Sequence, residues 1–319
     1  MSTSLARTAD GWWAVTPAGL VRLGLPATTT AGLLADRAAL AAAIEAAHVA
    51  GAQDAVSAGS LDLLSPVTAP ARVVAQAVNY RSHAADSGFD PDHVPPAFFR
   101  KASHSITGPT GDIIRPDGVE FLDYEVELGL VFGADLPVGT TVTDENLARY
   151  VAALVVANDV SARQIQLVKT QFYESKSYPT FTPVGPWLTL VDAADLARLD
   201  SLRLTLSVSG ELRQDSTVAD MIVRPAQALT LLSRFQPMAP GDLLLTGTPG
   251  GTALKAPAKL AGMVAGLLPP ATRWKLFFKR QAANPRYLHD GDLILATIAS
   301  PDGQLDLGTQ WTPVIRKTP

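Results

Sequence analysis

The stretch LDYEVELGLV, residues 122–131, alternates acidic side chains with apolar or aromatic ones. Alternate side chains of a β-strand point to opposite faces, so the pattern predicts a strand with Asp123, Glu125 and Glu127 on one face. The solvated face of an amphipathic strand would explain these acids. Three like charges in a row also repel one another, and a bound divalent cation would offset that repulsion. Carboxylate oxygens suit Mg²⁺, Mn²⁺ or Ca²⁺ rather than zinc.

A second acidic position follows the apolar run 151–157, which is long enough for a buried strand and ends in Asn158-Asp159. Asp159 has two interpretations: it caps a helix that begins near residue 161, or it belongs to a ligand site. Arg163, Gln166 and Lys176 lie shortly after it, and each carries donors that can hold a carboxylate or carbonyl of a bound ligand.

A histidine and an acid lie three residues apart, at His83 and Asp86, and would share one face of a helix. An acid beside an imidazole can fix its tautomer and raise its basicity, which a water-activating base requires. Such a pair is also common as a plain surface contact. The other histidines have no comparable setting.

A strand-like run leads into a glycine-rich loop in LLLTGTPGGT, residues 243–252. The loop lacks the Lys-Ser/Thr ending of a P-loop and the spacing of a dinucleotide-binding fingerprint, so by itself it predicts only a tight turn. The pattern Gly-x-Ser-x-Gly is absent, which disfavours a serine-hydrolase nucleophile elbow.

Composition narrows the class of protein. The 319 residues carry 26 Lys plus Arg and 30 Asp plus Glu, a formal net charge of −4, and no cysteine. The absence of cysteine excludes disulfides, thiolate zinc sites and cysteine nucleophiles, and the acidic balance disfavours nucleic acid as a partner. No apolar run approaches the roughly 18–20 residues that span a bilayer, and the first residues lack the apolar core of a secretory signal. We therefore expect a cytoplasmic protein with no membrane partner.

The chain divides into two regions that differ in composition and in the pattern of apolar residues. The sequence of residues 1–69 predicts a small N-terminal α/β domain, with a hairpin at 12–23 and an alanine-rich helix that stops at Gly51. The sequence of residues 70–319 predicts a β-rich domain. Helices are expected to open at Thr143 and at Pro225. A regular strand–helix alternation is missing, which disfavours a doubly wound sheet or a TIM barrel. Residues 253–286 interrupt the pattern as an insertion. The predicted strands are 73–78, 126–132, 154–157, 187–191, 202–208, 243–246 and 293–298.

Several stretches in series resemble the fumarylacetoacetate hydrolase (FAH) family, and the resemblance covers about residues 70–315. These stretches are Asn79-Tyr80-x-x-His83, Phe98-Phe99-Arg100-Lys101, residues 123–128 as Asp-Tyr-Glu-Val-Glu-Leu, residues 158–163 as Asn-Asp-Val-Ser-Ala-Arg, Lys176-Ser177, residues 183–187 as Pro-Val-Gly-Pro-Trp, and residues 246–249 as Thr-Gly-Thr-Pro. The resemblance implies a β-rich α+β fold, in which a mixed β-roll follows a small N-terminal domain. It also implies a homodimer.

The resemblance assigns roles to individual positions. Family metal ligands fall on Glu125, Glu127 and Asp159, which would hold Mg²⁺ or Mn²⁺, with Ca²⁺ as a further option. The family's basic lysine falls on Lys176, and the histidine of its water-activating dyad falls on His83. Substrate contacts fall on four further residues, Tyr80, Arg163, Gln166 and Thr248.

The sequence also departs from the family pattern. Many members carry glutamate three residues after the dyad histidine, where this chain has the shorter Asp86, and the common Lys-Ser-Phe-Asp is here Lys176-Ser177-Tyr178-Pro179. The insertion at 253–286 is long for the family. It would either cap the pocket or build a contact between subunits.

The implied reaction is hydrolysis of a C–C bond in a diketo acid, such as an acylpyruvate or a fumarylpyruvate-like compound from aromatic catabolism. A metal-bound enolate would form, and His83 with Asp86 would activate the water. The same site would also serve a decarboxylase, tautomerase or hydratase of a 2-oxo acid. A third alternative is a biosynthetic or binding member of the family that has lost hydrolysis, which the departures at Asp86 and Pro179 motivate.

Overall fold

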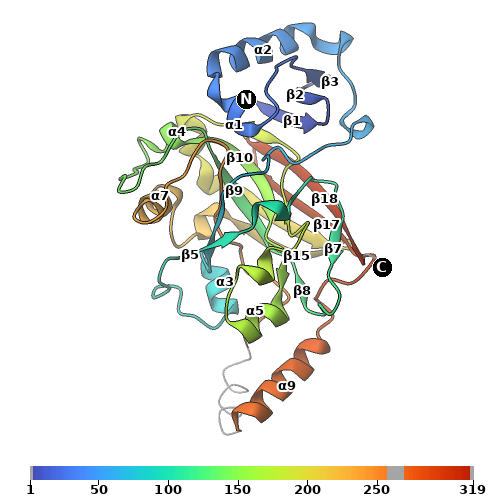
Figure 1. Cartoon of the computed structure of the whole chain (residues 1–319), viewed down its shortest axis with the longest axis vertical. Coiled ribbons are helices and arrows are strands. Elements are labelled where there is room, and N and C mark those ends of the chain that lie inside the picture. Colours follow the sequence, from blue (N-terminus) through green and yellow to red (C-terminus); the bar gives the residue numbers. More distant parts are fainter. Residues whose placement is uncertain (1–2, 257–268, 317–319) are drawn as a thin grey trace.

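The computed structural model describes residues 3–256 and 269–316, and within them two open sheets form the body of the molecule (Figure 1). The larger sheet runs in the order β3 (Gly19–Arg22), β2 (Gly11–Thr16), β1 (Ser4–Thr8), β13 (Leu188–Leu190), β10 (Val151–Asn158), β9 (Val126–Phe132), β16 (Leu243–Leu245), β4 (Val73–Ala77), β5 (Ala97–Lys101). The smaller sheet runs in the order β15 (Glu211–Thr217), β14 (Arg203–Val208), β17 (Leu293–Ala299), β18 (Asp306–Arg316), β7 (Ile113–Arg115). Two short ladders join β8 (Leu122–Asp123) to β11 (Ser161–Ala162) and β6 (Ile106–Thr107) to β12 (Thr182–Pro183).

Helices are fewer and mostly short, so the predicted β-rich α+β class is confirmed. The helices are α1 (Thr30–Ala35), α2 (Arg37–Ala50), α3 (Arg81–Asp86), α4 (Leu147–Tyr150), α5 (Arg163–Lys169), α6 (Ala193–Leu196), α7 (Pro225–Ser233) and α9 (Pro270–Ala282). Single 3₁₀ turns are η1 (Gly51–Gln53), η2 (Ala58–Ser60), η3 (Ser103–Ser105), η4 (Glu174–Lys176), η5 (Leu199–Ser201) and η6 (Val218–Asp220). None of the helices in the described ranges is long and apolar enough to span a bilayer.

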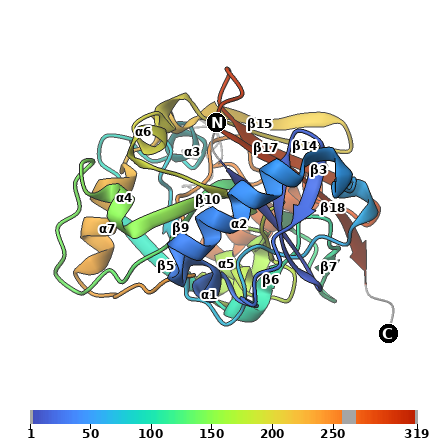
Figure 2. The same cartoon turned by 90° about the horizontal axis from the view of Figure 1, so that it is seen from above.

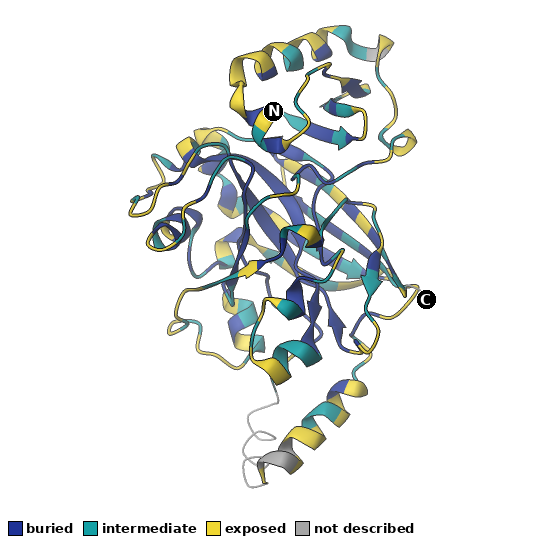
Figure 3. Cartoon of the chain, in the orientation of Figure 1, coloured by how far each residue is buried: buried dark blue, intermediate teal, exposed yellow. Residues whose placement is uncertain are grey.

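The centre of the fold is the antiparallel pair β9 and β10, in which every residue is buried (Figure 3). Strands that are buried on both faces read as nearly continuous apolar runs, which is how these two read in the sequence. The smaller sheet packs its β14, β17 and β18 against this pair. Because β9 and β10 are antiparallel, the start of β9 lies beside the end of β10, and this juxtaposition positions the candidate site.

The N-terminal residues form the predicted hairpin and helix. Strands β2 and β3 pair antiparallel, and α2 ends where Gly51 adopts φ 57° and donates its N–H to Ala47. Helix α2 packs across β2 and β3 at the top of the molecule (Figures 1 and 2). Strand β1 pairs with β13, so these strands extend the large sheet. The boundary at residue 69/70 stays a prediction.

All seven predicted strands form, and α7 begins at Pro225 as predicted. The prediction that a helix opens at Thr143 is wrong. Residues 144–146 form a turn, in which the backbone N–H of Thr143 donates to the side chain of Asn146 at 2.9 Å, and α4 is a single turn that leads directly into β10. This local side-chain bond competes with helix formation.

The insertion predicted at 253–286 is described only in part, because its residues 257–268 lie outside the described residues. Its described portion includes α9, which projects from the body below α5 (Figure 1). Trp274 and Leu276 on this helix are about half exposed.

Candidate functional site

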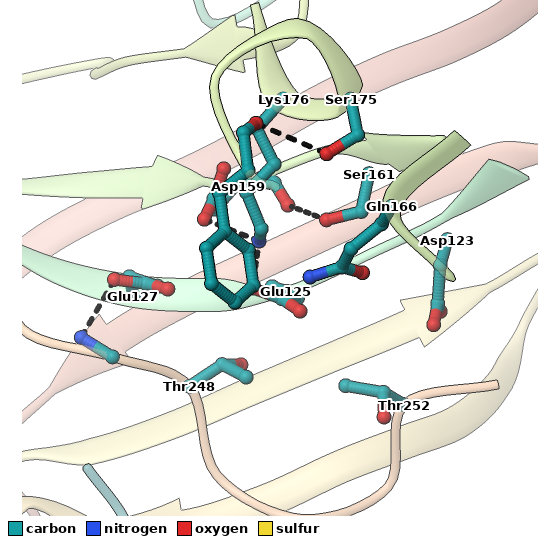
Figure 4. Close-up of polar contacts among 12 residues, drawn as sticks. Asp123, Glu125, Glu127, Asp159, Ser161, Gln166, Ser175, Lys176, Thr248 and Thr252 are labelled. Carbon is teal, nitrogen blue, oxygen red and sulfur yellow. Dashed lines mark hydrogen bonds and ion pairs between the residues drawn. The ribbon is translucent and has the colours of Figure 1, made fainter. Parts of the chain in front are cut away.

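Three carboxylates meet where β9 begins and β10 ends. Glu125 precedes β9, Glu127 lies in β9, and Asp159 directly follows β10. The N–H of Asp159 donates to the carbonyl of Glu125 at 2.8 Å, which fixes the two chain segments side by side. One carboxylate oxygen of each residue lies within 4.8 Å of the others, and all three residues are buried. Figure 4 shows the three side chains with neighbouring residues of the site.

The interpretation of residues 123–127 as a solvated acidic face is wrong, because Asp123, Glu125 and Glu127 are 0%, 5% and 1% exposed. Asp123 does not join the cluster. Its carboxylate accepts the N–H groups of Ala253 and Leu254, at 2.9 and 3.1 Å, and the Nε–H of Arg163 at 2.8 Å. Asp123 therefore ties the segment after β16 to the site.

The interpretation of Asp159 as a helix cap is also wrong. Helix α5 begins four residues later, and its N-cap position is Ala162. The carboxylate of Asp159 instead bonds the amines of Lys176, at 2.6 Å, and Lys101. A carboxylate with two buried ammonium partners is part of a charge network rather than of a capping box.

Buried cations surround the cluster. Lys176 Nζ donates to Glu125 Oε2 at 2.7 Å as well as to Asp159, and Arg163 Nη2 bonds Glu125 Oε1. Lys101 Nζ reaches Asp159 and the carbonyl of Phe181, the latter at 2.9 Å. No role for Lys101 follows from the sequence analysis. In the sequence, Lys101 is marked only by its position at the end of the Phe-Phe-Arg-Lys stretch. The pairing of β5 with β4 in the folded chain is what brings Lys101 near Asp159.

The three acids differ in how far neighbouring cations offset their negative charge. Burial alone would raise the pKa of Glu125, but the charges of Lys176 and Arg163 hold it well below its usual range. Burial and the negative charges of Asp159 and Glu125 raise the pKa of Glu127 well above its usual range. The carboxylate of Glu127 accepts the N–H of Gly247 at 2.7 Å. Glu127 thus carries the uncompensated repulsion that a cation would relieve.

The residues fit a hard divalent cation. The donors are three buried carboxylates, all oxygen, with converging ligand atoms and like-charge repulsion at Glu127. The glycine-rich loop allows this approach: Gly247 has φ +86°, and a Cβ at this position would lie 2.7 Å from the Cβ of Asn79. The loop therefore brings a backbone donor close to the cluster where a larger residue would not fit.

His83 lies in α3 and lines the same cavity as Glu125 and Glu127. Its Nδ1 is buried and has no hydrogen-bond partner in the described residues. Burial lowers the pKa of His83, so the imidazole is neutral at neutral pH and can accept a proton.

Asp86 does not bond His83 in this structure. Its carboxylate accepts the N–H of Gly251 at 2.9 Å and forms an ion pair with Lys255 Nζ at 3.0 Å. Helix α3 therefore carries both residues, as predicted, but directs Asp86 toward the segment that follows β16. The predicted water-activating pair stays a prediction.

The cavity that contains the site has a volume of about 480 Å³. His83, Lys176 and the predicted substrate contacts Arg163, Gln166 and Thr248 all line it. The Oε1 of Gln166 accepts Arg163 Nη1 at 2.9 Å, and the hydroxyl of Thr248 donates to the carbonyl of Val126 at 2.9 Å. Tyr80 is fully buried and does not line this cavity.

Comparison with known proteins identifies the class. The model of the family described as fumarylacetoacetate (FAA) hydrolase C-terminal matches residues 72–314, and the chain belongs to this family of enzymes. Over the full length of both chains, the structure is similar to a probable 2-hydroxyhepta-2,4-diene-1,7-dioate isomerase from Mycobacterium abscessus, with a TM-score of 0.71 and 27% sequence identity.

Curated relatives with named activities include a tautomerase and a hydrolase. The mitochondrial oxaloacetate tautomerase FAHD2B of Bos taurus is 36% identical over 190 residues, which are 59% of this chain and 59% of the relative. The 2,4-didehydro-3-deoxy-L-rhamnonate hydrolase of a Sphingomonas species is 36% identical over 187 residues, 58% of this chain and 64% of the relative. The matched region thus spans about three-fifths of the length of these relatives.

Proposed function

We propose that this protein is a divalent-metal-dependent hydrolase that cleaves a C–C bond in a diketo acid of the acylpyruvate type. The observation that carries the proposal is that His83, a buried neutral base, lines one cavity with Glu125, Glu127 and the cations beside them. The relative from Sphingomonas, named as a hydrolase, supports the same class of reaction.

Glu125, Glu127 and Asp159 would hold the cation, which would supply Lewis-acid stabilisation of the negative charge that develops on the substrate oxygens. His83 takes a proton from a water molecule, and the water oxygen attacks the carbonyl carbon farther from the carboxylate. The bond from that carbon to its neighbour on the 2-oxo acid side breaks, and the electron pair stays on the neighbour, which then takes the proton that His83 removed from the water. Lys176 and Arg163 form ion pairs with Glu125 and so offset its negative charge.

Replacement of His83 by Ala tests this role. We expect kcat for an acylpyruvate to fall by about 10²-fold or more, because general-base catalysis contributes about 10²–10⁴-fold. Mn²⁺ affinity, measured by calorimetry, should stay within about threefold, since His83 is not in the carboxylate cluster. His93→Ala is the matched control, because His93 is exposed and forms an ion pair with Asp90 away from the carboxylate cluster. Full activity of the His83 variant would exclude the proposed role.

Tautomerisation or decarboxylation of a 2-oxo acid on the same site is the second candidate. The engagement of Asp86 with Gly251 and Lys255 favours it, because a histidine without an acid partner is a weaker base for water. The relatives named as oxaloacetate tautomerases favour it as well. Assays of oxaloacetate and of a panel of diketo acids with Mg²⁺ separate the two reactions. Tight binding of these acids without turnover would indicate the non-hydrolytic alternative.

Mg²⁺ or Mn²⁺ as the ion and a homodimer as the assembly belong to the same proposal, and both rest on the resemblance to the family. The cytoplasmic location stays a prediction, since several relatives are named as mitochondrial proteins.

A further inference from the structure

The lining of the cavity contains two chemically different sets of side chains. One set is polar and charged and includes His83, Glu125 and Glu127 with the cations Arg163 and Lys176. The other set, which Ser87, Thr170 and Gln171 accompany, is large and apolar and comes from five separate segments of the chain: Phe89, Phe99, Leu167, Phe172, Leu254 and Phe277. No one stretch of sequence carries this apolar wall, and Phe277 comes from α9, within the predicted insertion.

The apolar wall starts beside the carboxylate cluster. Lys176 Nζ, which bridges Glu125 and Asp159, lies 5.2 Å from the ring centroid of Phe99. Phe99 in turn stacks on Phe172, with ring centroids 4.9 Å apart. A molecule whose oxygens lie at the carboxylates would therefore have these two rings close beside it.

The outer part of the wall is exposed to solvent. Phe172 is 36% exposed and Phe89 is 56% exposed, although both line a cavity. Exposed large apolar side chains that gather at a cavity mark a ligand surface, since covering them removes apolar area from water.

The cations that line the cavity in the described residues are already paired. Arg163 bonds Asp123 and Glu125, Lys176 bonds Glu125 and Asp159, and Lys255 pairs with Asp86. A second carboxylate at the far end of a substrate would find no unpaired cation among these residues and so would gain no ion pair there. An apolar tail in the same place would cover the exposed rings, and removal of this apolar area from water favours its binding.

We infer that the cavity selects 2,4-dioxo acids whose distal substituent is an alkyl or aryl group, and that it discriminates against substrates with a second, distal carboxylate. This inference rests on the proposed function and deepens it, because it chooses between the acylpyruvate and the fumarylpyruvate-like classes. The 2-oxo acid end lies at the carboxylate cluster, and the apolar tail lies along Phe99 and Phe172.

A matched pair of compounds tests the inference. We expect the Mg²⁺-loaded protein to hydrolyse 2,4-dioxooctanoate with a kcat/KM at least tenfold higher than that for 2,4-dioxooctanedioate, which has the same chain length and a terminal carboxylate. Phe172→Arg should reduce this preference at least tenfold by supplying a cation, while the matched control Phe172→Leu should retain it. Equal rates, or a preference for the diacid, would overturn the inference.

A binding measurement separates this inference from the proposed function. The compounds 2-oxooctanoate and 2-oxooctanedioate lack the 4-oxo group that the water would attack, so their affinities, measured by calorimetry, do not depend on turnover. Tighter binding of the monoacid without hydrolysis of either dioxo acid would uphold the inference and contradict the proposed reaction. Tighter binding of the diacid, or binding of neither compound, would overturn the inference.

Discussion

Glu127 carries the main electrostatic strain of the site. It is buried beside two other carboxylates, whereas Glu125 and Asp159 each contact buried cations. Burial and the charges of Asp159 and Glu125 raise the pKa of Glu127, so the folded state holds a proton there more tightly than the unfolded chain does. This contribution favours folding at low pH and is lost as the pH rises through the folded-state pKa.

We therefore expect metal-free Glu127→Gln to be more stable than the unmodified protein above the ordinary carboxyl pKa. Its melting temperature should be higher by about 2 °C or more, and the difference should grow with pH. The amide oxygen can still accept the N–H of Gly247. The rise in melting temperature that Mn²⁺ causes should shrink strongly, because one ligand is lost.

Thermal unfolding at several pH values, with and without Mn²⁺, measures both effects. Glu45→Gln is the control, because Glu45 is exposed on α2. A Glu127→Gln variant that is less stable at every pH and keeps its full response to Mn²⁺ would contradict the assignment of Glu127 as a ligand.

The acids of residues 122–131 illustrate how far sequence reasoning reaches at this scale. Alternation in a strand is local, so Glu125 and Glu127 were correctly predicted to share a face. Asp123 does not join the carboxylate cluster, because its side chain accepts the backbone N–H groups of Ala253 and Leu254, about 130 residues away in the chain. The sequence pattern contains no information about that contact.

At the scale of elements, α3 connects the base to the loop that follows β16. His83 lines the cavity, and Asp86 holds Gly251 and Lys255. Catalytic hydrogen bonds are often long or poorly aligned in ligand-free structures and tighten only in the substrate complex. The role of Asp86 in catalysis therefore depends on whether it exchanges these partners for His83 when substrate binds.

We expect Asp86→Asn to lower kcat at least tenfold while the melting temperature changes by less than about 3 °C. The amide oxygen can still accept the N–H of Gly251, but it cannot stabilise an imidazolium. Lys255→Gln is the matched variant: it removes a partly exposed ion pair, worth about 0–1 kcal/mol, and leaves Asp86 charged. Steady-state kinetics of both variants decide the point. An unchanged kcat for Asp86→Asn would show that Asp86 has only a structural role, in which it bonds Gly251 and Lys255.

At the scale of the whole molecule, the N-terminal strands and the large sheet share one hydrophobic core. Leu5, Trp12 and Leu33 pack in the same buried cluster as Val155 and Leu243. Strand β1 also covers an edge of β13. Exposed strand edges with apolar surface favour aggregation.

We therefore expect the fragment 70–319 to aggregate when it is produced alone, since removal of residues 1–69 uncovers β13 and the core beneath α2. Soluble yield and size-exclusion chromatography, with the full-length chain as control, measure this outcome. A soluble fragment that binds Mn²⁺ as tightly as the full chain would show instead that residues 70–319 form an independent domain, as the change in sequence composition near residue 70 predicts.

The sequence by itself determined the β-rich class, the principal strands, the carboxylates of the site and the family. These properties depend on local periodicity, on turn residues and on the order of short motifs along the chain, all of which can be read from the linear sequence. Only the tertiary structure decided that Lys101 joins the cluster, that Asp86 bonds Gly251 and Lys255, and that an apolar wall assembles from five segments. Those outcomes depend on which distant segments meet, and strand pairing and burial across the whole chain determine that.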